Sequence, residues 1–166
     1  MKNLTTTIIL LLMTISCNRN KLISKPVQNF DINKYLGTWY EIARTDNKFE
    51  KGCTNVSAEY TMRSDGGINV INRCNVGDKS KKASGRGYFR NAKNIGSLKV
   101  AFFWPFYGNY NVIYIDKDYQ YALVDGGSLD YLWILSKTKT IPQEQKSQML
   151  NIAKENGFNV DNLIYS

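Results

Sequence analysis

Gly37-Thr38-Trp39-Tyr40-Glu41-Ile42-Ala43-Arg44 is the stretch of sequence that decides the fold. A glycine opens it, and the aromatic and β-branched residues that follow favour an extended strand. Successive side chains of a strand point to opposite faces of the sheet. If Trp39 points into the molecule, Glu41 and Ala43 therefore share its face. We predict the first strand of a sheet over this stretch.

Similar short alternating runs, separated by turn signals, follow over most of the chain. In residues 55–62, Val56, Ala58 and Tyr60 alternate with polar residues, and Asp65-Gly66 supplies the hairpin turn that follows. Further strands are expected at 68–74, 87–90, 98–104, 110–115, 119–124 and 131–136. Eight such strands indicate an all-β fold, an up-and-down antiparallel barrel wide enough for packed side chains or one small ligand.

One helix is expected after the last barrel strand. Met149, Leu150 and Ala153 lie at helical spacing, so their apolar stripe can pack on the outside of the barrel. Thr140 and Gln143 resemble a capping box at its start. Gly157 is a plausible terminator, and residues 162–165 are expected to add a short final strand.

The first sixteen residues are predicted to be a signal peptide. Lys2 supplies a positive start, and the apolar run 8–13 is far shorter than the ~20 residues that span a membrane. Cys17 follows directly, and the segment resembles the bacterial lipobox, in which this thiol carries a diacylglycerol. Plain cleavage of the signal and an uncleaved anchor remain the alternatives.

The residues after Cys17 read as a polar, basic tether over 17–29, which leaves 30–166 as the barrel domain. Asn18 stands where Asp would be the usual signal for retention in the inner membrane. We therefore expect a protein of the cell envelope, lipid-anchored to the outer membrane and facing the periplasm.

The composition narrows the chemistry. The 166 residues contain no histidine, so the commonest general base and transition-metal ligand is missing, and we expect no metal and no cofactor. The net charge of +8 could suit nucleic acid, an anionic membrane surface or an anionic ligand. A solvated basic surface explains the same charge, and we expect no nucleic-acid partner.

Cys53 and Cys74 are the two cysteines that remain after Cys17. In an exported protein they are expected to form a disulfide, with two separate buried thiols as the alternative. A two-residue turn at Asp65-Gly66 would place Ser57, not Cys53, opposite Cys74. A disulfide therefore requires a β-bulge or a bridge from the segment before the strand.

The opening stretch resembles the first motif of the lipocalins, a Gly-x-Trp at the barrel floor. The resemblance continues in order through 51–56, 67–73, 102–108, 118–123 and 131–136, nearly the whole mature chain. It is most similar to the bacterial outer-membrane lipoprotein branch of the family, and also similar to apolipoprotein D and plant temperature-induced lipocalins. The resemblance implies that Gly37 and Trp39 form the floor, where Lys137 replaces the usual Arg.

The resemblance also implies a small hydrophobic ligand, a fatty acid or lysophospholipid. An aromatic content of 13% suits an apolar pocket. Leu98, Val100, Phe102 and Trp104 share one face of their strand, which we assign to the lumen; packing beneath the helix is the alternative. Phe106 and Tyr110, with the neighbouring Tyr107, are expected at the rim of the ligand site.

Two other classes of function stay open. An enzyme would need Cys53 as nucleophile or Glu41 as acid–base group, and both have structural uses in the prediction above. A structural or interaction role in the envelope would apply if the barrel is filled by its own side chains. We expect a carrier or storage protein, not an enzyme, present as a monomer or homodimer.

Overall fold

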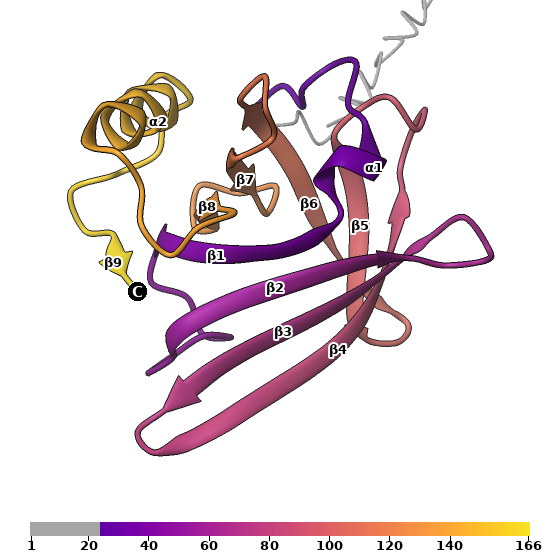
Figure 1. Ribbon diagram of the computed structural model, residues 1–166, viewed down its shortest axis with the longest axis horizontal. Helices are drawn as coiled ribbons and strands as arrows, with labels where there is room; N and C mark the ends of the chain where they lie inside the picture. The colour runs from indigo at the N-terminus through magenta and orange to yellow at the C-terminus, as the bar shows by residue number, and fades with distance from the viewer. Residues whose placement is uncertain (1–23) are drawn as a thin grey trace, which may run out of the picture.

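The computed structural model describes residues 24–166, so the predicted signal peptide and Cys17 lie outside the described residues. Strands dominate this part of the chain, with one helix after the barrel (Figure 1). The elements are α1 (Ile32–Tyr35), β1 (Gly37–Arg44), β2 (Thr54–Met62), β3 (Ile68–Val76), β4 (Lys79–Phe89), β5 (Ser97–Phe103), β6 (Phe106–Ile115), β7 (Tyr121–Asp125), β8 (Leu132–Ser136), α2 (Gln143–Glu155) and β9 (Ile164–Tyr165).

The strands from β1 to β8 close into an antiparallel barrel, as predicted. Each strand pairs with the next, and β1 closes the ring because it pairs with both β8 and β2. Its first half, Gly37–Tyr40, pairs with β2, whereas Ala43 and Arg44 pair with β9. No helix of the described residues is long and apolar enough to cross a membrane.

The chain enters the barrel along its outer wall. The Val27 amide donates to the carbonyl of Val112 at 2.8 Å, and the Gly96 amide donates to Val27 at 2.9 Å. Ser24 is buried and hydrogen-bonds the carboxylate of Asp125 at the end of β7. The described part of the predicted tether is therefore held against β5, β6 and β7.

A β-bulge in β1 corrects one expectation from the sequence. Glu41 pairs with Leu135, and Ala43 pairs with Ile134, so Ile42 is an extra residue in this strand. The extra residue reverses the alternation of faces. Ala43 consequently packs outside, with the cluster beneath α2, and does not share the inner face of Trp39 as predicted.

Cys53 and Cys74 form a disulfide, with Cα atoms 5.4 Å apart, and the prediction is confirmed. The hairpin before Cys74 is longer than predicted, because Met62 pairs with Ile68 and five residues connect them. A register shift between Thr54 and Ser57 supplies the required bulge, and Cys53 precedes the strand.

The helix α2 packs on the outside of the barrel through Met149 and Ala153, as expected. The predicted capping box is wrong. The helix starts at Gln143 after Pro142, which makes no side-chain capping bond, and the carbonyl of Thr140 instead accepts from the Thr138 hydroxyl at 2.8 Å. Gly157 ends the helix with a φ of +87°, a conformation that glycine adopts without strain.

Candidate ligand-binding site

The inner face of the barrel is the candidate site, and its floor is closed by packed aromatic rings. Trp39 is fully buried, and its ring stacks on Tyr35 of α1 with centroids 4.7 Å apart. Lys137 lies 4.4 Å above the Trp39 ring, and its Nζ donates to the carbonyl of Leu36 at 2.5 Å. Gly37, with a φ of +98°, leaves room for this lysine, since an added Cβ would lie 3.4 Å from Nζ.

The floor lysine sits over the indole face of Trp39 and hydrogen-bonds the last turn before β1. Burial lowers the pKa of the Lys137 ammonium to about 8. A single ammonium cannot bond several carbonyls in one plane as a guanidinium can. Gly37, Trp39 and Lys137 are therefore brought together at the floor, where their contacts are with protein groups.

Three tyrosine hydroxyls form a hydrogen-bonded group just above the floor. The hydroxyl of Tyr110 lies 2.6 Å from that of Tyr35 and 2.8 Å from that of Tyr60. Burial raises the pKa of each hydroxyl, so all three stay neutral. The prediction that Tyr110 lies at the rim is wrong: β6 begins at Phe106, four residues earlier, which carries Tyr110 down to the base of the site.

The predicted ligand-binding residues separate into two groups. The inner cluster that contains Trp39 also includes Leu98, Val100, Phe102 and Tyr110. The strand face assigned to the lumen is therefore correct for Leu98, Val100 and Phe102. Trp104 and Phe106 do not join them. Their side chains are 83% and 77% exposed at the tip of the β5–β6 hairpin.

Solvent accessibility along the inner face shows which end is open. Near the floor, Ile68 and Val70 are 2% and 3% exposed. Farther along β3, the inward-facing Asn72 is half-buried, and its partner on β4, Ala83, is exposed. Phe102 is half-buried at this level. The barrel is therefore packed at the floor and reached by solvent at the opposite end, the end of the β1–β2, β3–β4, β5–β6 and β7–β8 connections.

Gly85 leaves room for the Phe102 ring on the inner wall. A Cβ added to Gly85 of β4 would lie 2.9 Å from Phe102 Cδ1. This spacing is too short for a carbon–carbon contact. The ring therefore lies directly on the backbone of β4, where a larger residue would displace it.

A buried ionic group occupies the inner wall near the open end. Arg44 is 2% exposed, and its Nη1 donates to Glu41 Oε1 at 2.6 Å. Its Nη2 donates to the carbonyls of Glu50 and Cys53 at 3.0 and 3.2 Å. Burial, followed by the charge of Glu50, raises the pKa of the Glu41 carboxyl to about 7 although Arg44 opposes the shift.

This ionic group ties the β1–β2 connection to β8, which pairs with β1. The Trp133 indole of β8 donates to Glu50 Oε2 at 2.9 Å, and Asn47 Nδ2 donates to the same oxygen at 2.7 Å. Two buried polar atoms have no partner among the described residues, Arg44 Nε and Asn72 Oδ1. The inner surface is thus apolar on the β5 side and polar on the β1 side.

The sequence did not single out Arg44, Glu50 or Trp133 for this site. Arg44 turns inward only because Ile42 bulges out of β1, and no residue of the strand signals that bulge. Arg44 is the last residue of a strand that also holds Glu41, and these two opposite charges were the available hint. Glu41 and Cys53, the two candidates for catalysis, are occupied here by Arg44 and by the disulfide.

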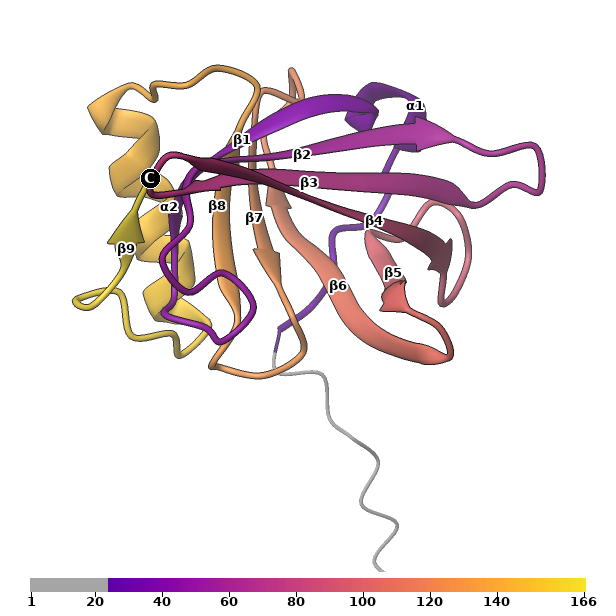
Figure 2. The same cartoon turned by 90° about the horizontal axis from the view of Figure 1, so that it is seen from below.

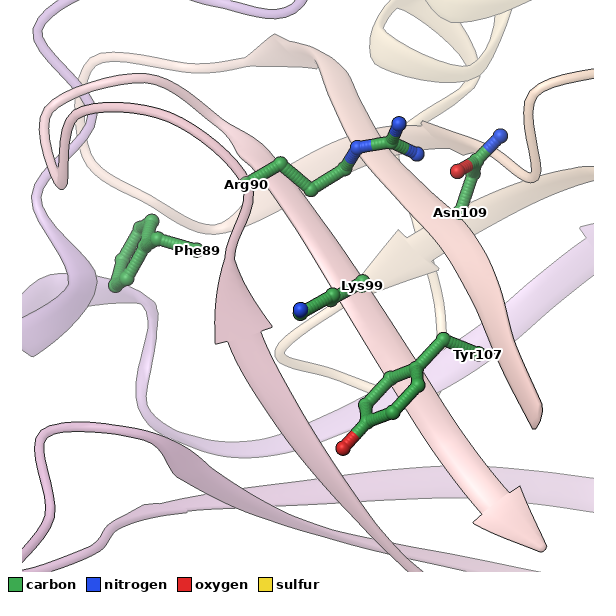
Figure 3. Close-up of a pocket in the computed structure, with 5 residues that line it drawn as sticks. All are labelled: Phe89, Arg90, Lys99, Tyr107 and Asn109. Atoms are coloured by element: carbon green, nitrogen blue, oxygen red, sulfur yellow. The ribbon is translucent and has the colours of Figure 1, made fainter. Parts of the chain in front are cut away.

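A pocket of about 460 Å³ lies elsewhere, on the outer side of β4, β5 and β6. Figure 3 shows Arg90, Lys99, Tyr107 and Asn109 gathered over these strands, whereas the Phe89 ring points away from them. Arg90, Lys99 and Tyr107 are exposed, and the Lys99 ammonium lies 5.1 Å from the centre of the Tyr107 ring. The pocket is solvent-open and cationic, unlike the apolar site expected for a lipid chain.

Comparisons with known proteins agree with this architecture. The family model of the lipocalin-like domain matches residues 30–166. The outer membrane lipoprotein Blc of Citrobacter freundii is 54% identical over 141 residues, covering 84% of this chain and 80% of that protein. Temperature-induced lipocalin-1 of Arabidopsis thaliana is 36% identical over 146 residues, covering 82% and 78%. Insecticyanin of the tobacco hornworm shares the fold with a TM-score of 0.68 at 21% identity, covering 86% and 83%.

The chain belongs to the lipocalin family, a family of binding and transport proteins. The family named from the sequence and the barrel predicted with it are both confirmed. The relatives named outer membrane lipoprotein also confirm the expected lipid-anchored location in the outer membrane of the envelope. That Cys17 is the lipidated residue stays a prediction. Among the described residues, no group of three potential ligands for a metal ion was found.

Proposed function

We propose that this lipocalin binds, and carries or stores, a fatty acid or lysophospholipid inside the open half of its barrel. The observation that carries the proposal is the rise in solvent exposure along the inner face, from the floor to the open end. Apolar residues run continuously from the sealed floor to a solvent-reached level at Val100 and Phe102. An acyl chain that enters there removes its own surface and that of these side chains from water.

The energetics of an acyl chain suit such a site. Each buried methylene contributes about 0.8 kcal/mol. Micromolar affinity requires about 8 kcal/mol, and the loss of translational and rotational freedom must be offset in addition. A chain of about sixteen carbons has roughly fourteen methylenes, which contribute about 11 kcal/mol if all are buried. The micromolar binding that we expect therefore requires nearly the whole chain to be buried.

The membrane anchor is part of the same proposal. Cys17 directly follows the predicted signal peptide and stands seven residues before Ser24, the first described residue. A diacylglycerol on its thiol would keep the barrel beside the membrane that supplies acyl lipids.

Phe102→Asp tests the position of the ligand. An unpaired carboxylate on the inner wall, beside Val100 and over Gly85, would be strongly disfavoured once the acyl chain excludes water. We expect oleate binding, measured by quenching of tryptophan fluorescence, to weaken at least about 100-fold, or about 2.7 kcal/mol. Phe103→Asp is the matched control, since the neighbouring side chain is 80% exposed and its substitution should leave affinity unchanged.

Circular dichroism must show that the Phe102→Asp barrel is folded. A folded variant that binds oleate as tightly as the wild type would show that Phe102 does not contact the ligand. If the wild type itself binds neither oleate nor a lysophospholipid, carriage is wrong and the structural role in the envelope takes its place.

A further inference from the structure

Large apolar side chains are exposed at one side of the molecule. They lie on three connections, β1–β2 (45–53), the β5–β6 hairpin tip (103–106) and β7–β8 (126–131), which together we call the loop face. The exposed members are Phe49 at 72%, Phe103 at 80%, Trp104 at 83%, Phe106 at 77% and Leu129 at 45%. Figure 2 shows the three connections reaching the same lower side, with the β3–β4 hairpin turned away from it.

The loop face is not explained by packing within the chain. Side chains exposed to this degree contribute little to the core, and an apolar patch of this kind marks a contact with another molecule or with a membrane. Tryptophan and phenylalanine are favoured where water meets lipid. The Lys48 ammonium lies 5.3 Å from the centre of the Phe49 ring, so this side chain can reach water or headgroups while the ring enters lipid.

The start of the described chain lies at the same side. Ser24 bonds to Asp125, which directly precedes the β7–β8 connection, and the segment from Ser24 to Phe30 then runs back toward the floor. In Figure 2 this indigo segment begins at the lower side, beside the loop face. Ser24 is the seventh residue after Cys17, so the chain between them reaches at most about 25 Å when fully extended.

We propose that the loop face is a membrane-docking surface, which seats three of the four connections at the open end of the barrel on the lipid bilayer. The proposal rests on the lipid anchor proposed for Cys17, because a short tether leaving beside the loop face would hold that face toward the bilayer. The mouth of the barrel would then open on the membrane, so that an acyl chain could pass between bilayer and barrel without crossing water.

The charges on the loop face indicate what kind of contact this is. Its exposed ionisable side chains are Asp46, Lys48, Lys51 and Asp130, two of each sign. The contact would therefore be mainly apolar. Docking should depend little on salt or on the proportion of anionic lipid, unlike the binding of a polybasic surface.

Fluorescence of Trp104 tests the proposal in the anchored protein. The mature chain is reconstituted into vesicles of phosphatidylethanolamine and phosphatidylglycerol, with no acyl ligand, and bromine-labelled lipids are added as quenchers. The difference between the wild type and Trp104→Phe isolates the signal of Trp104. We expect this signal to be quenched by bromolipid and shielded from aqueous acrylamide.

The matched control moves the tryptophan to the other end of the barrel. Met62 is 42% exposed at the end of β2, beside the β2–β3 connection at the floor. In Trp104→Phe with Met62→Trp, the new indole should be quenched several times less by bromolipid and freely by acrylamide. Phe49→Ser with Phe106→Ser should return Trp104 to water while the protein still floats with the vesicles.

Equal bromolipid quenching at positions 104 and 62, or none at 104, would overturn the proposal. Shielding of Trp104 from acrylamide without bromolipid quenching would also overturn it, because the loop face would then contact protein. If the chain does not float with the vesicles, the lipid anchor proposed for Cys17 and the docking proposal are both wrong. None of these readouts uses an acyl ligand, so a failure here leaves oleate binding to be judged by its own titration.

Discussion

Replacement of Arg44 by leucine should destabilise the barrel far more than the loss of one ordinary ion pair. Arg44 is 2% exposed and is the only described cation that contacts Glu41, which is itself 5% exposed. Leucine fills much of the volume and removes the charge. Glu41 would then be buried beside Glu50 with the Ser166 hydroxyl, 2.8 Å away, as its remaining side-chain partner.

The magnitude follows from this burial. Removing one partner of a buried ion pair costs about 3–5 kcal/mol, because an uncompensated charge stays behind. Arg73→Leu is the matched control, since Arg73 pairs with Glu59 at 2.9 Å but both side chains are well exposed, at 43% and 34%. An exposed pair contributes at most about 1 kcal/mol.

The cost should also depend on pH. The pKa of Glu41 is about 7 in the folded chain, above its ordinary value of 4.5, so between these values the folded state binds the extra proton. The contribution of Glu41 to the free energy of unfolding therefore falls as pH rises. Removing Arg44 raises the folded pKa further, and the penalty should be larger near pH 8 than near pH 5.

Urea unfolding of both variants at the two pH values measures these differences. Adding Glu41→Gln to Arg44→Leu should recover part of the loss at pH 8 and little at pH 5. A penalty for Arg44→Leu that equals that of Arg73→Leu, or that does not change with pH, would refute the assignment of a buried ionic group to this wall.

Three further predictions concern the floor, the disulfide and the anchor. Lys137→Met leaves the Leu36 and Tyr35 carbonyls without their bonds to Nζ and should lower the free energy of unfolding by about 1–3 kcal/mol. Lys137→Arg should lower it little, because a guanidinium can still donate to these carbonyls. Equal midpoints of urea unfolding for the two variants would contradict this. Cys53→Ser with Cys74→Ser opens a loop of sequence separation 21 and should lower stability by about 3 kcal/mol, with no change expected in a reduced sample. Cys17→Ser should release the protein from the membrane fraction of cells, and unchanged fractionation would disprove the lipid anchor.

Much of the fold could be predicted because each local signal pointed to the same barrel. The stretch from Gly37 to Arg44 forms β1 with the predicted bounds, and the expected helix packs outside through Met149 and Ala153. Two of the errors arose where the strand pairing departs from simple alternation or from a tight turn. The Ile42 bulge reverses the faces of β1, and the connection after Met62 is longer than a two-residue turn. Neither needs an unusual residue, so neither leaves a signal in the sequence.

The site could be predicted only along the uniform part of a strand. Alternation correctly placed Leu98, Val100 and Phe102 inside, because the pairing of β5 with β4 is regular from Leu98 to Ala101. It failed at Trp104, since a register shift after Val100 and the turn at the hairpin end the alternation there. Arg44 and Trp133 are paired residues on the neighbouring strands β1 and β8, and this pairing depends on how the sheet closes.

The central claim is that the barrel holds one acyl chain, and native mass spectrometry of the protein purified from cells tests it most directly. The account predicts a fraction of the protein with one fatty acid or lysophospholipid bound, and loading of the remainder when oleate is added. Phe102→Asp, folded and purified in the same way, should carry neither. A wild-type protein that shows only its bare mass, before and after addition of oleate or lysophospholipid, would contradict the claim.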